Sequence, residues 1–316
     1  MKALITGGAG CIGSVLASKL LGYGHSMLVF DNLSSGKEEH IQKLLKDKNF
    51  EFVNGDLLKP EQIKSACKGV EVVFHLAANS DVKYKPGNPT DEDLKLNIVG
   101  TYNVLEAMRV NDVKKIVFTS SSVVYGEAKK TPTPENYPLE PISLYAASKI
   151  ADEALISGFC HMFGMQAWIV RLANIIGNKT RRVGKTVISD FIDKLGKNPK
   201  ELEILGDGKQ KKSYLLVDDC IEGIMTVFSK SNDKINTYNL GPEDSVTVNK
   251  IAEIVVNEMK LKNVKFEYTG GDRGWLGDVP TFLLDTNKIR SLGWKPKHTS
   301  EEAIRIAAKS LLRVDR

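Results

Sequence analysis

A glycine-rich loop near the start of the sequence constrains the fold more than any other feature. The loop Gly7-Gly8-Ala9-Gly10-Cys11-Ile12-Gly13 follows an apolar run at residues 2–6, precedes apolar residues at helical spacing, and is followed by a second run that ends at Asp31. This order of strand, glycine loop, helix, strand and acid is typical of a dinucleotide-binding βαβ unit. Glycines let the backbone approach a pyrophosphate at the helix N-terminus. We therefore predict a cofactor site that includes Gly7, Gly10, Cys11, Ile12 and Gly13.

Acidic residues after two predicted strands indicate which dinucleotide binds. Asp31 is placed to bond both ribose hydroxyls of the adenosine, and a carboxylate there repels the 2′-phosphate of NADP. The sequence therefore favours NAD, with Asn32 beside Asp31; the alternative is that Asp31 is only a turn residue. Asp56 and Leu57, which follow the run at 50–53, are predicted to hold the adenine edge.

Strand-like and helical segments alternate along the first half of the chain. Apolar runs at 70–77, 114–119 and 167–172 alternate with helical segments at 91–110 and 143–163. This alternation predicts an α/β fold with a doubly wound parallel sheet, the Rossmann architecture. Beyond about residue 173 the segments become shorter. We predict an NAD-binding Rossmann domain at 1–172, to which 215–240 return, and a smaller C-terminal α/β substrate lobe at 173–316.

A tyrosine and a lysine four residues apart lie at the start of a predicted helix. Tyr145 and Lys149 share one face of that helix, downstream of a strand that ends in Ser120 and Ser121. An ammonium beside a phenol, and the positive charge of an oxidised nicotinamide, both favour the phenolate, so a phenol with an ordinary pKa of about 10 can become a base. We predict that Tyr145 is the base, that Lys149 lowers its pKa, and that Ser121 bonds the reacting hydroxyl. Ser120, Tyr145 and Lys149 would also line the cofactor site; the serines could otherwise be an ordinary polar strand end.

The composition argues against several other classes of protein. The chain has 316 residues and a formal net charge of +5, and its lysines are scattered rather than gathered with aromatic residues as in nucleic-acid binders. No apolar run approaches the roughly 20 residues that span a bilayer, and no charged leader with a long apolar stretch is visible, so we expect a cytoplasmic protein with no membrane partner. The cysteines form no CxxC pair, and we expect no metal.

Several motifs in a fixed order resemble the extended short-chain dehydrogenases/reductases, and the resemblance covers residues 1 to about 310. Besides the glycine loop and Tyr145-x-x-x-Lys149, the motifs lie at 75–78, Asn97, 121–126, 171–177, 206–214, 217–219 and 277–280. Within this superfamily the chain is most similar to the UDP-glucose (UDP-galactose) 4-epimerases. The resemblance implies transient oxidation of a UDP-sugar at C4 with bound NAD. It also implies cofactor contacts from Asn97 and Ala77, diphosphate contacts from Asn174 and Lys212, and a uridine ribose contact from Asp278.

Two positions depart from the family pattern. Many relatives have arginine where this chain has Lys212, and lysine cannot form the same bidentate fork. Many also have an arginine three residues before the aspartate that corresponds to Asp278, where this chain has Trp275. The nearest arginine is Arg273, which reaches the diphosphate only if the loop is rearranged.

The residues after Ser121 favour epimerisation over dehydration and decarboxylation of a nucleotide sugar. Related 4,6-dehydratases carry an Asp-Glu pair there and UDP-glucuronate decarboxylases usually a glutamate, whereas this chain has Ser122 and Val123. Elimination without carboxylates lacks its acid and base. A UDP-glucuronate 4-epimerase stays open, and so does a non-catalytic NAD-binding sensor, although such sensors tend to lose the Tyr/Lys pair.

Sugar preference and assembly rest on the resemblance alone. Phe282 corresponds to the far wall of the sugar pocket, where a bulky residue crowds an N-acetyl group and so favours UDP-glucose and UDP-galactose. UDP-N-acetylglucosamine stays open, because Phe282 could serve only core packing. The family often forms homodimers through two helices of each subunit, here residues 91–111 and 143–163.

Overall fold

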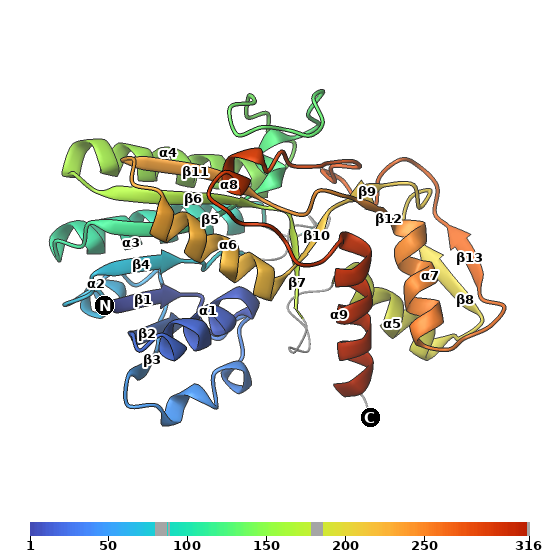
Figure 1. The fold of residues 1–316 in the computed structure, drawn as a ribbon, viewed down its shortest axis with the longest axis horizontal. Coiled ribbons are helices and arrows are strands. Elements are labelled where there is room, and N and C mark those ends of the chain that lie inside the picture. The colour runs from blue at the N-terminus through green and yellow to red at the C-terminus, as the bar shows by residue number, and fades with distance from the viewer. Residues whose placement is uncertain (80–86, 88, 178–185, 315–316) are drawn as a thin grey trace.

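A parallel sheet forms the centre of the molecule. The computed structural model describes residues 1–79, 87, 89–177 and 186–314. Within these ranges the strands of the main sheet are β1 (Lys2–Thr6), β2 (Ser26–Asp31), β3 (Phe50–Asn54), β4 (Val72–His75), β5 (Lys115–Ser121), β6 (Gln166–Leu172) and β11 (Ile235–Leu240). They run parallel in the order β11-β6-β5-β4-β1-β2-β3 (Figure 1). The strand order reverses between β1 and β4, which is where ligands bind in open α/β sheets.

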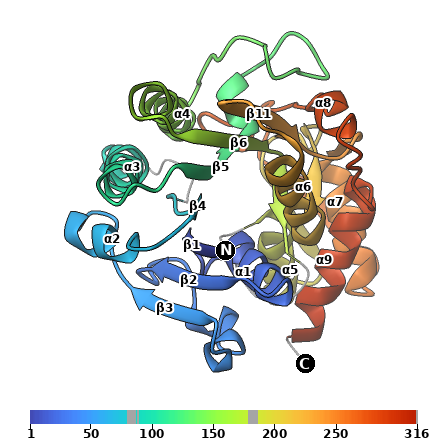
Figure 2. The ribbon, with the colours of Figure 1, turned by 60° about the vertical axis from the view of Figure 1, so that its left-hand side comes forward.

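Helices cover both faces of this sheet (Figure 2). Their bounds are α1 (Cys11–Gly22), α2 (Pro60–Ala66), α3 (Gly100–Val110), α4 (Leu144–Phe163) and α6 (Val217–Lys230). Successive β1 residues face opposite sides: Ala3 and Ile5 pack in the apolar cluster with α1 and α6, and Leu4 packs in the cluster with α2, α3 and α4. This is the period-2 burial of a doubly covered sheet, and it confirms the predicted Rossmann architecture.

The helix predicted at 91–110 is not a single regular helix. It begins as a π-helix, η3 (Leu94–Val99), and continues as α3. π-Helical turns are rare and occur mostly where a side chain has a special task. Here the wider turn carries Asn97 into the interior between α4 and the end of β4, so its amide faces polar groups rather than the apolar layer. Two 3-10 turns, η1 (Glu38–His40) and η2 (Leu44–Lys46), precede β3, and η4 (Ser122–Tyr125) follows β5.

A second group of elements packs around its own apolar cluster. Its helices are α5 (Val187–Lys197), α7 (Val248–Glu258) and α9 (Ser300–Val314), and its strand pairs are β7 (Asn174–Ile176) with β10 (Tyr214–Leu216), β9 (Lys211–Lys212) with β12 (Val246–Thr247), and β8 (Glu201–Ile204) with β13 (Lys265–Tyr268). The cluster includes Phe191, Ile251 and Ile304. The short helix α8 (Asn287–Arg290) packs instead against β11 of the main sheet. We propose that 173–214 and 241–316 form the substrate lobe, since α6 and β11 pack with the main sheet.

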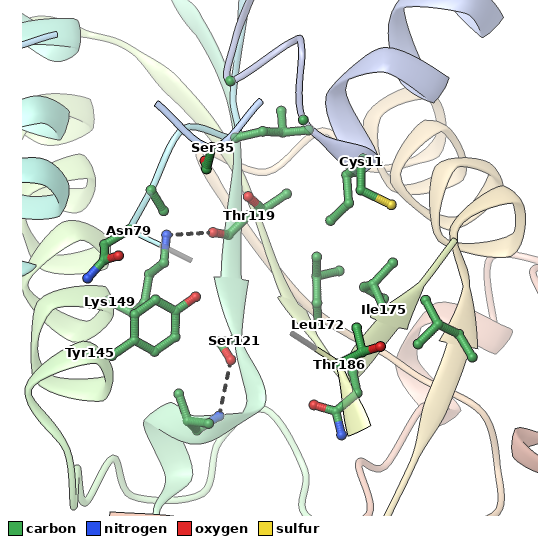
Figure 3. A pocket seen from close by; sticks show the side chains of 18 of the residues that line it. Cys11, Ser35, Asn79, Thr119, Ser121, Tyr145, Lys149, Leu172, Ile175 and Thr186 are labelled. Carbon is green, nitrogen blue, oxygen red and sulfur yellow. Dashed lines mark hydrogen bonds between the residues drawn. The ribbon is translucent and has the colours of Figure 1, made fainter. Parts of the chain in front are cut away.

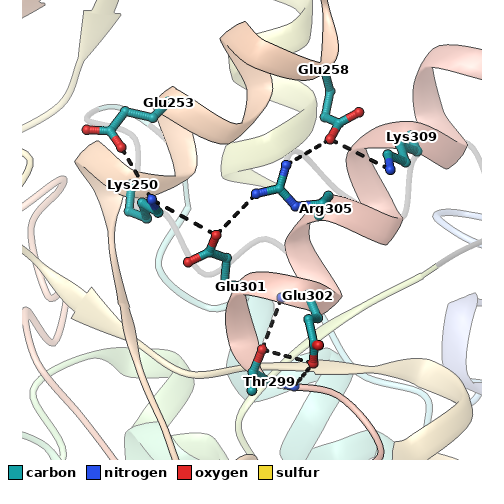
Figure 4. A network of polar contacts seen from close by, with 8 residues as sticks. All are labelled: Lys250, Glu253, Glu258, Thr299, Glu301, Glu302, Arg305 and Lys309. Atoms are coloured by element: carbon teal, nitrogen blue, oxygen red, sulfur yellow. Dashed lines mark hydrogen bonds and ion pairs between the residues drawn. The ribbon is translucent and has the colours of Figure 1, made fainter.

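Ion pairs between α7 and α9 lie on the surface of this lobe (Figure 4). Arg305 pairs with Glu258 at 3.0 Å and with Glu301 at 3.1 Å, and the Arg305 side chain is 39% exposed. Exposed pairs of this kind contribute little to stability, so the apolar cluster is the main contact between these helices. Within the described ranges, no helix is long and apolar enough to cross a bilayer.

Candidate active site

A cavity of about 770 Å³ lies at the carboxyl ends of the main strands, between the sheet and the second group of elements. The glycine loop, Asp31, the end of β5 and the start of α4 line one part of it. Lys212, Trp275 and Asp278 line the part formed by the second group. The cavity therefore joins the two halves of the predicted site. Among the described residues, no cluster of three or more His, Cys, Asp or Glu side chains could hold a metal ion.

The glycine loop is shaped by close backbone approaches. Gly7 has φ +69°, and a Cβ there would lie 2.7 Å from the Ala77 nitrogen; a Cβ on Gly13 would lie 2.3 Å from the Gly7 carbonyl oxygen. Both positions therefore need glycine. The N-cap of α1, Gly10, has no side-chain hydrogen bond, so the first N–H groups of the helix stay available to an anion. Gly7, Gly10, Cys11, Ile12 and Gly13 all line the cavity.

The carboxylate of Asp31 is fixed by the backbone around it. Its Oδ2 accepts a hydrogen bond from Ala9 N at 2.9 Å, and its Oδ1 accepts one from Leu33 N at 2.9 Å. Each carboxylate oxygen can accept a further bond, so both remain able to bind ligand hydroxyls. Asn32, Asp56 and Leu57, which are near Asp31, line the cavity, and so does Ala77 beside the glycine loop.

The tyrosine, lysine and serine converge on one wall of the cavity (Figure 3). Ser143 caps α4 by accepting a hydrogen bond from Ala146 N, which sets the helix start beside β5. The Lys149 Nζ lies 5.9 Å from the centre of the Tyr145 ring and donates to the Thr119 carbonyl at 3.1 Å. The Tyr145 hydroxyl points toward the space between Thr119 and Ser121.

Burial dominates the pKa of Tyr145 in the absence of a cofactor. Burial raises the pKa of the phenol above its ordinary value, and the nearby carboxylates of Asp93 and Asp152 raise it further. Lys149 is itself buried, and burial lowers its pKa. Burial therefore outweighs any stabilisation of the phenolate by the protein groups alone, and the role of Lys149 in lowering the pKa of Tyr145 stays a prediction for the site with oxidised NAD bound.

The Ser120 side chain belongs to a buried network that sequence reasoning missed. Its hydroxyl donates to Glu153, which forms a two-pronged ion pair with Arg171 at 3.0 and 2.7 Å. Arg171 also donates to the Tyr125 hydroxyl at 2.8 Å. Ser120 lines the cavity as predicted, but its proton is committed to Glu153. The signal was present in the sequence, because Glu153 follows Lys149 by one turn on the same helix.

Two predicted site residues do not line the cavity. Asn97 is buried behind it, where its oxygen accepts from Asn79 N at 2.7 Å and its amide donates to Ser148 at 2.8 Å. Asn97 thus supports Asn79, which does line the cavity. Arg273 forms an ion pair with Glu127 and donates weakly to the Asp278 carbonyl. In this structure the guanidinium of Arg273 pairs with Glu127 outside the cavity wall, and its reach to the diphosphate stays a prediction.

The remaining substrate residues do line the cavity. Asn174, Lys212, Asp278 and Phe282 all belong to its wall. Lys212 forms an ion pair with Asp278, and its Nζ lies 4.5 Å from the centre of the Trp275 ring. Trp275, noted in the sequence only as a departure, thus stacks on the lysine that itself stands in place of an arginine.

Comparisons with known proteins agree with this arrangement. The family model described as GDP-mannose 4,6 dehydratase matches residues 4–307. A Methanocaldococcus jannaschii protein provisionally named UDP-glucose 4-epimerase is 35% identical over 96% of this chain and 95% of its own length. The crystal structure of a UDP-galactose 4-epimerase is 37% identical, with a TM-score of 0.88 and 99% coverage of each chain.

Other proteins similar to this chain are named for more than one reaction. A Thermus thermophilus UDP-glucose 4-epimerase, solved in complex with NAD, is 28% identical, with a TM-score of 0.87 and 99% coverage of each chain. UDP-glucuronic acid decarboxylase 1 of Arabidopsis thaliana is 29% identical over 96% of this chain and 68% of its own length. The chain belongs to the GDP-mannose 4,6 dehydratase family of short-chain dehydrogenases/reductases. This is a family of enzymes, the NAD-dependent epimerases and dehydratases of nucleotide sugars.

Proposed function

We propose that the protein is a UDP-sugar 4-epimerase that interconverts UDP-glucose and UDP-galactose with NAD held in the cavity. The observation that carries this proposal is the meeting of Tyr145, Lys149 and Ser121 on one cavity wall that continues into the glycine loop. This joins a proton-transfer group to a dinucleotide cradle. The relatives named as 4-epimerases support the same reaction.

The residues of the cradle fit NAD. The uncapped start of α1 suits a pyrophosphate, and the buried Asp31 carboxylate suits two ribose hydroxyls while it disfavours a 2′-phosphate. Asn32, Asp56 and Leu57 complete the adenosine end, and Ala77, Ser120 and Lys149 line the opposite end. Bound NAD supplies the redox chemistry at sugar C4 and, when oxidised, a positive charge beside the phenol.

Replacing Gly13 with alanine tests this cradle. We expect Gly13→Ala to weaken NAD binding at least about tenfold, because a Cβ would lie 2.3 Å from Gly7 O and 2.6 Å from Gly8 Cα, and both are backbone atoms of the loop. Calorimetry and the NAD content of the purified protein give the measurement. Gly158→Ala is the matched control, since a Cβ there meets nothing within 4 Å. Equal NAD affinity in both variants would contradict this use of the loop.

The proton chemistry belongs to three side chains. The Tyr145 phenolate takes the proton from the sugar 4-hydroxyl and later returns it, while Ser121 bonds the same oxygen. Lys149, as an ammonium, favours the phenolate. In the other part of the cavity, Asn174 and Lys212 would bind the diphosphate and Asp278 a ribose hydroxyl. Such anchoring far from C4 lets the sugar turn between the two half-reactions without leaving the site.

The position of the carboxylates favours epimerisation over dehydration or decarboxylation. Among the described lining residues, the carboxylates are Asp31 and Asp56 in the glycine-loop part, and Asp190 and Asp278 in the second group. Val123, which lines the cavity beside Ser121, is apolar. An elimination at C5 and C6 needs an acid and a base at the sugar. A UDP-glucuronate 4-epimerase is the second candidate, because nothing in the described wall excludes a substrate carboxylate.

Phe282 is the residue with which we test sugar choice. It lines the cavity and packs partly buried against the cluster that contains Tyr125 and Leu284. We expect Phe282→Ser to raise kcat/KM for UDP-N-acetylgalactosamine relative to UDP-galactose by about tenfold, since room for a few heavy atoms is worth about 1–3 kcal/mol. The ratio of the two rates corrects for any general loss of activity. An unchanged ratio would assign Phe282 to packing alone.

We further propose a homodimer through α3 and α4. These helices lie side by side (Figure 2). Large apolar side chains are exposed on both: Leu94 and Tyr102 on the η3–α3 segment, and Leu144 and Met162 on α4. Exposed apolar groups on neighbouring helices are consistent with a protein interface. Light scattering of the purified protein tests this proposal.

The direct test of the reaction uses the purified protein without added NAD. UDP-galactose and UDP-N-acetylgalactosamine are incubated separately, and the anomeric protons are followed by NMR. The proposal predicts conversion to the gluco epimer, faster for UDP-galactose. If neither sugar changes, even with NAD supplied, the proposal fails.

A further inference from the structure

A buried carboxylate lies behind the catalytic wall and has no assigned task. Asp152 on α4 is 0% exposed, and neither of its oxygens has a hydrogen bond of normal geometry within the described part of the chain. Such a group is unfavourable to bury, and an unsatisfied buried group in a native protein needs an explanation. Asp152 follows Lys149 by three residues, so the two side chains share one face of the helix.

The groups that face Asp152 leave Lys149 as its cation. Thr101 of α3 faces Asp152 with a neutral hydroxyl, which lowers the pKa of the carboxyl without supplying a charge. Beyond Thr101, His75 of β4 is bonded at both ring nitrogens, to Thr6 at 2.7 Å and to Thr101 at 2.9 Å. Burial and the charge of Lys149 lower the pKa of His75 to about 3. His75 is therefore neutral, and it supplies no positive charge to this cluster.

The other carboxylates near Lys149 already have partners. Glu153 forms the two-pronged ion pair with Arg171, and Asp93, before η3, accepts from the amides of Asn79 and Asn97. Lys149 itself is buried, with one hydrogen bond to Thr119 and the Phe118 ring at 4.6 Å. Among these carboxylates, Glu153 has a cation and Asp93 has amide donors, whereas neither oxygen of Asp152 has a hydrogen bond of normal geometry within the described residues.

We propose that Asp152 is a positioning residue whose carboxylate keeps the buried Lys149 in the ammonium form beside Tyr145. This rests on the proposed function for the role of Lys149, although the charge state of Lys149 can be measured without any substrate. The cost of burying an unsatisfied carboxylate is explained if its charge maintains the charge of Lys149. The alkaline limit of activity then depends on Asp152.

The electrostatics of the pair have the required sign. Burial lowers the pKa of Lys149, and Asp152 is the first of the carboxylates that oppose this, before Glu153 and Asp93. Burial raises the pKa of Asp152 to about 6, and Lys149 opposes that shift. At pH 7 and above, Asp152 is ionised and stabilises the ammonium. Without this charge, Lys149 loses its proton at lower pH.

Asp152→Asn keeps the shape and removes the charge, so it is the test variant. Lysine labelled with ¹³C at Cε is titrated by NMR in the wild-type protein and in Asp152→Asn, with Lys149→Met to assign the signal. We expect the Lys149 midpoint to fall by at least about one pH unit, and the alkaline limb of kcat to fall with it. Thr101→Val, which disturbs the same cluster without removing a charge, should leave the midpoint within about 0.3 unit of the wild-type value.

Two outcomes would overturn the proposal. A Lys149 midpoint that is unchanged or raised in Asp152→Asn removes the electrostatic role, and an equal fall in Thr101→Val assigns the effect to packing. If the midpoint falls but the wild-type protein epimerises no sugar, Asp152 still maintains the charge of Lys149, and the proposed function fails. Should Asp152→Asn not fold, Asp152→Ala carries the same titration.

Discussion

Tyr145→Phe will lower kcat for epimerisation of UDP-galactose by about 10³-fold, because it removes the group that takes and returns the proton. The ring and its contacts remain, so the affinity for UDP should change less than about threefold. Steady-state kinetics and calorimetry with UDP measure the two effects separately.

Tyr214→Phe is the matched control for this variant. Tyr214 is a second buried tyrosine that lines the same cavity, but it lies in β10 near Asp278 rather than beside Lys149. Removing its hydroxyl should lower kcat less than about tenfold. Comparable losses in the two variants would contradict a special role for Tyr145.

Glu153→Ala will destabilise the folded protein by about 3–5 kcal/mol, because it leaves the Arg171 guanidinium buried without its carboxylate. Both side chains are under a tenth exposed. The same change leaves Ser120, at the end of β5, without its acceptor, so residual activity should also fall. Urea unfolding followed by circular dichroism gives the free energy of unfolding.

A surface ion pair provides the comparison. Glu222→Ala removes the partner of Lys19, and both of these side chains are more than a third exposed. We expect a loss of less than about 1 kcal/mol. If the two variants were equally stable, the Glu153–Arg171 pair would not be what joins α4 to β6.

The parts of the site that depend on local sequence could be predicted. The glycine loop, Asp31 and the Tyr145–Lys149 spacing act through short stretches of backbone whose geometry follows from residue type. The alternation of strands and helices gave the doubly wound sheet for the same reason. These elements need no knowledge of distant contacts.

The parts that the sequence could not reveal depend on distant contacts. Arg273 is held by Glu127, which lies far away in the sequence and meets it only in the folded chain. The pKa of Tyr145 is set mainly by burial, which no spacing reveals. Asn97, which the resemblance places in the cofactor cleft, lies on a π-helical turn behind the cavity wall, and no local spacing predicted that turn.

The mass of the product formed from UDP-glucose and from UDP-glucuronate, combined with its anomeric NMR signals, separates 4-epimerisation from the other reactions of the family. A 4-epimerase gives a product of unchanged mass with the galacto configuration, and we expect this product from UDP-glucose. Loss of water from UDP-glucose, or loss of carbon dioxide from UDP-glucuronate, would contradict this expectation and would place the protein with the dehydratases or decarboxylases of its family.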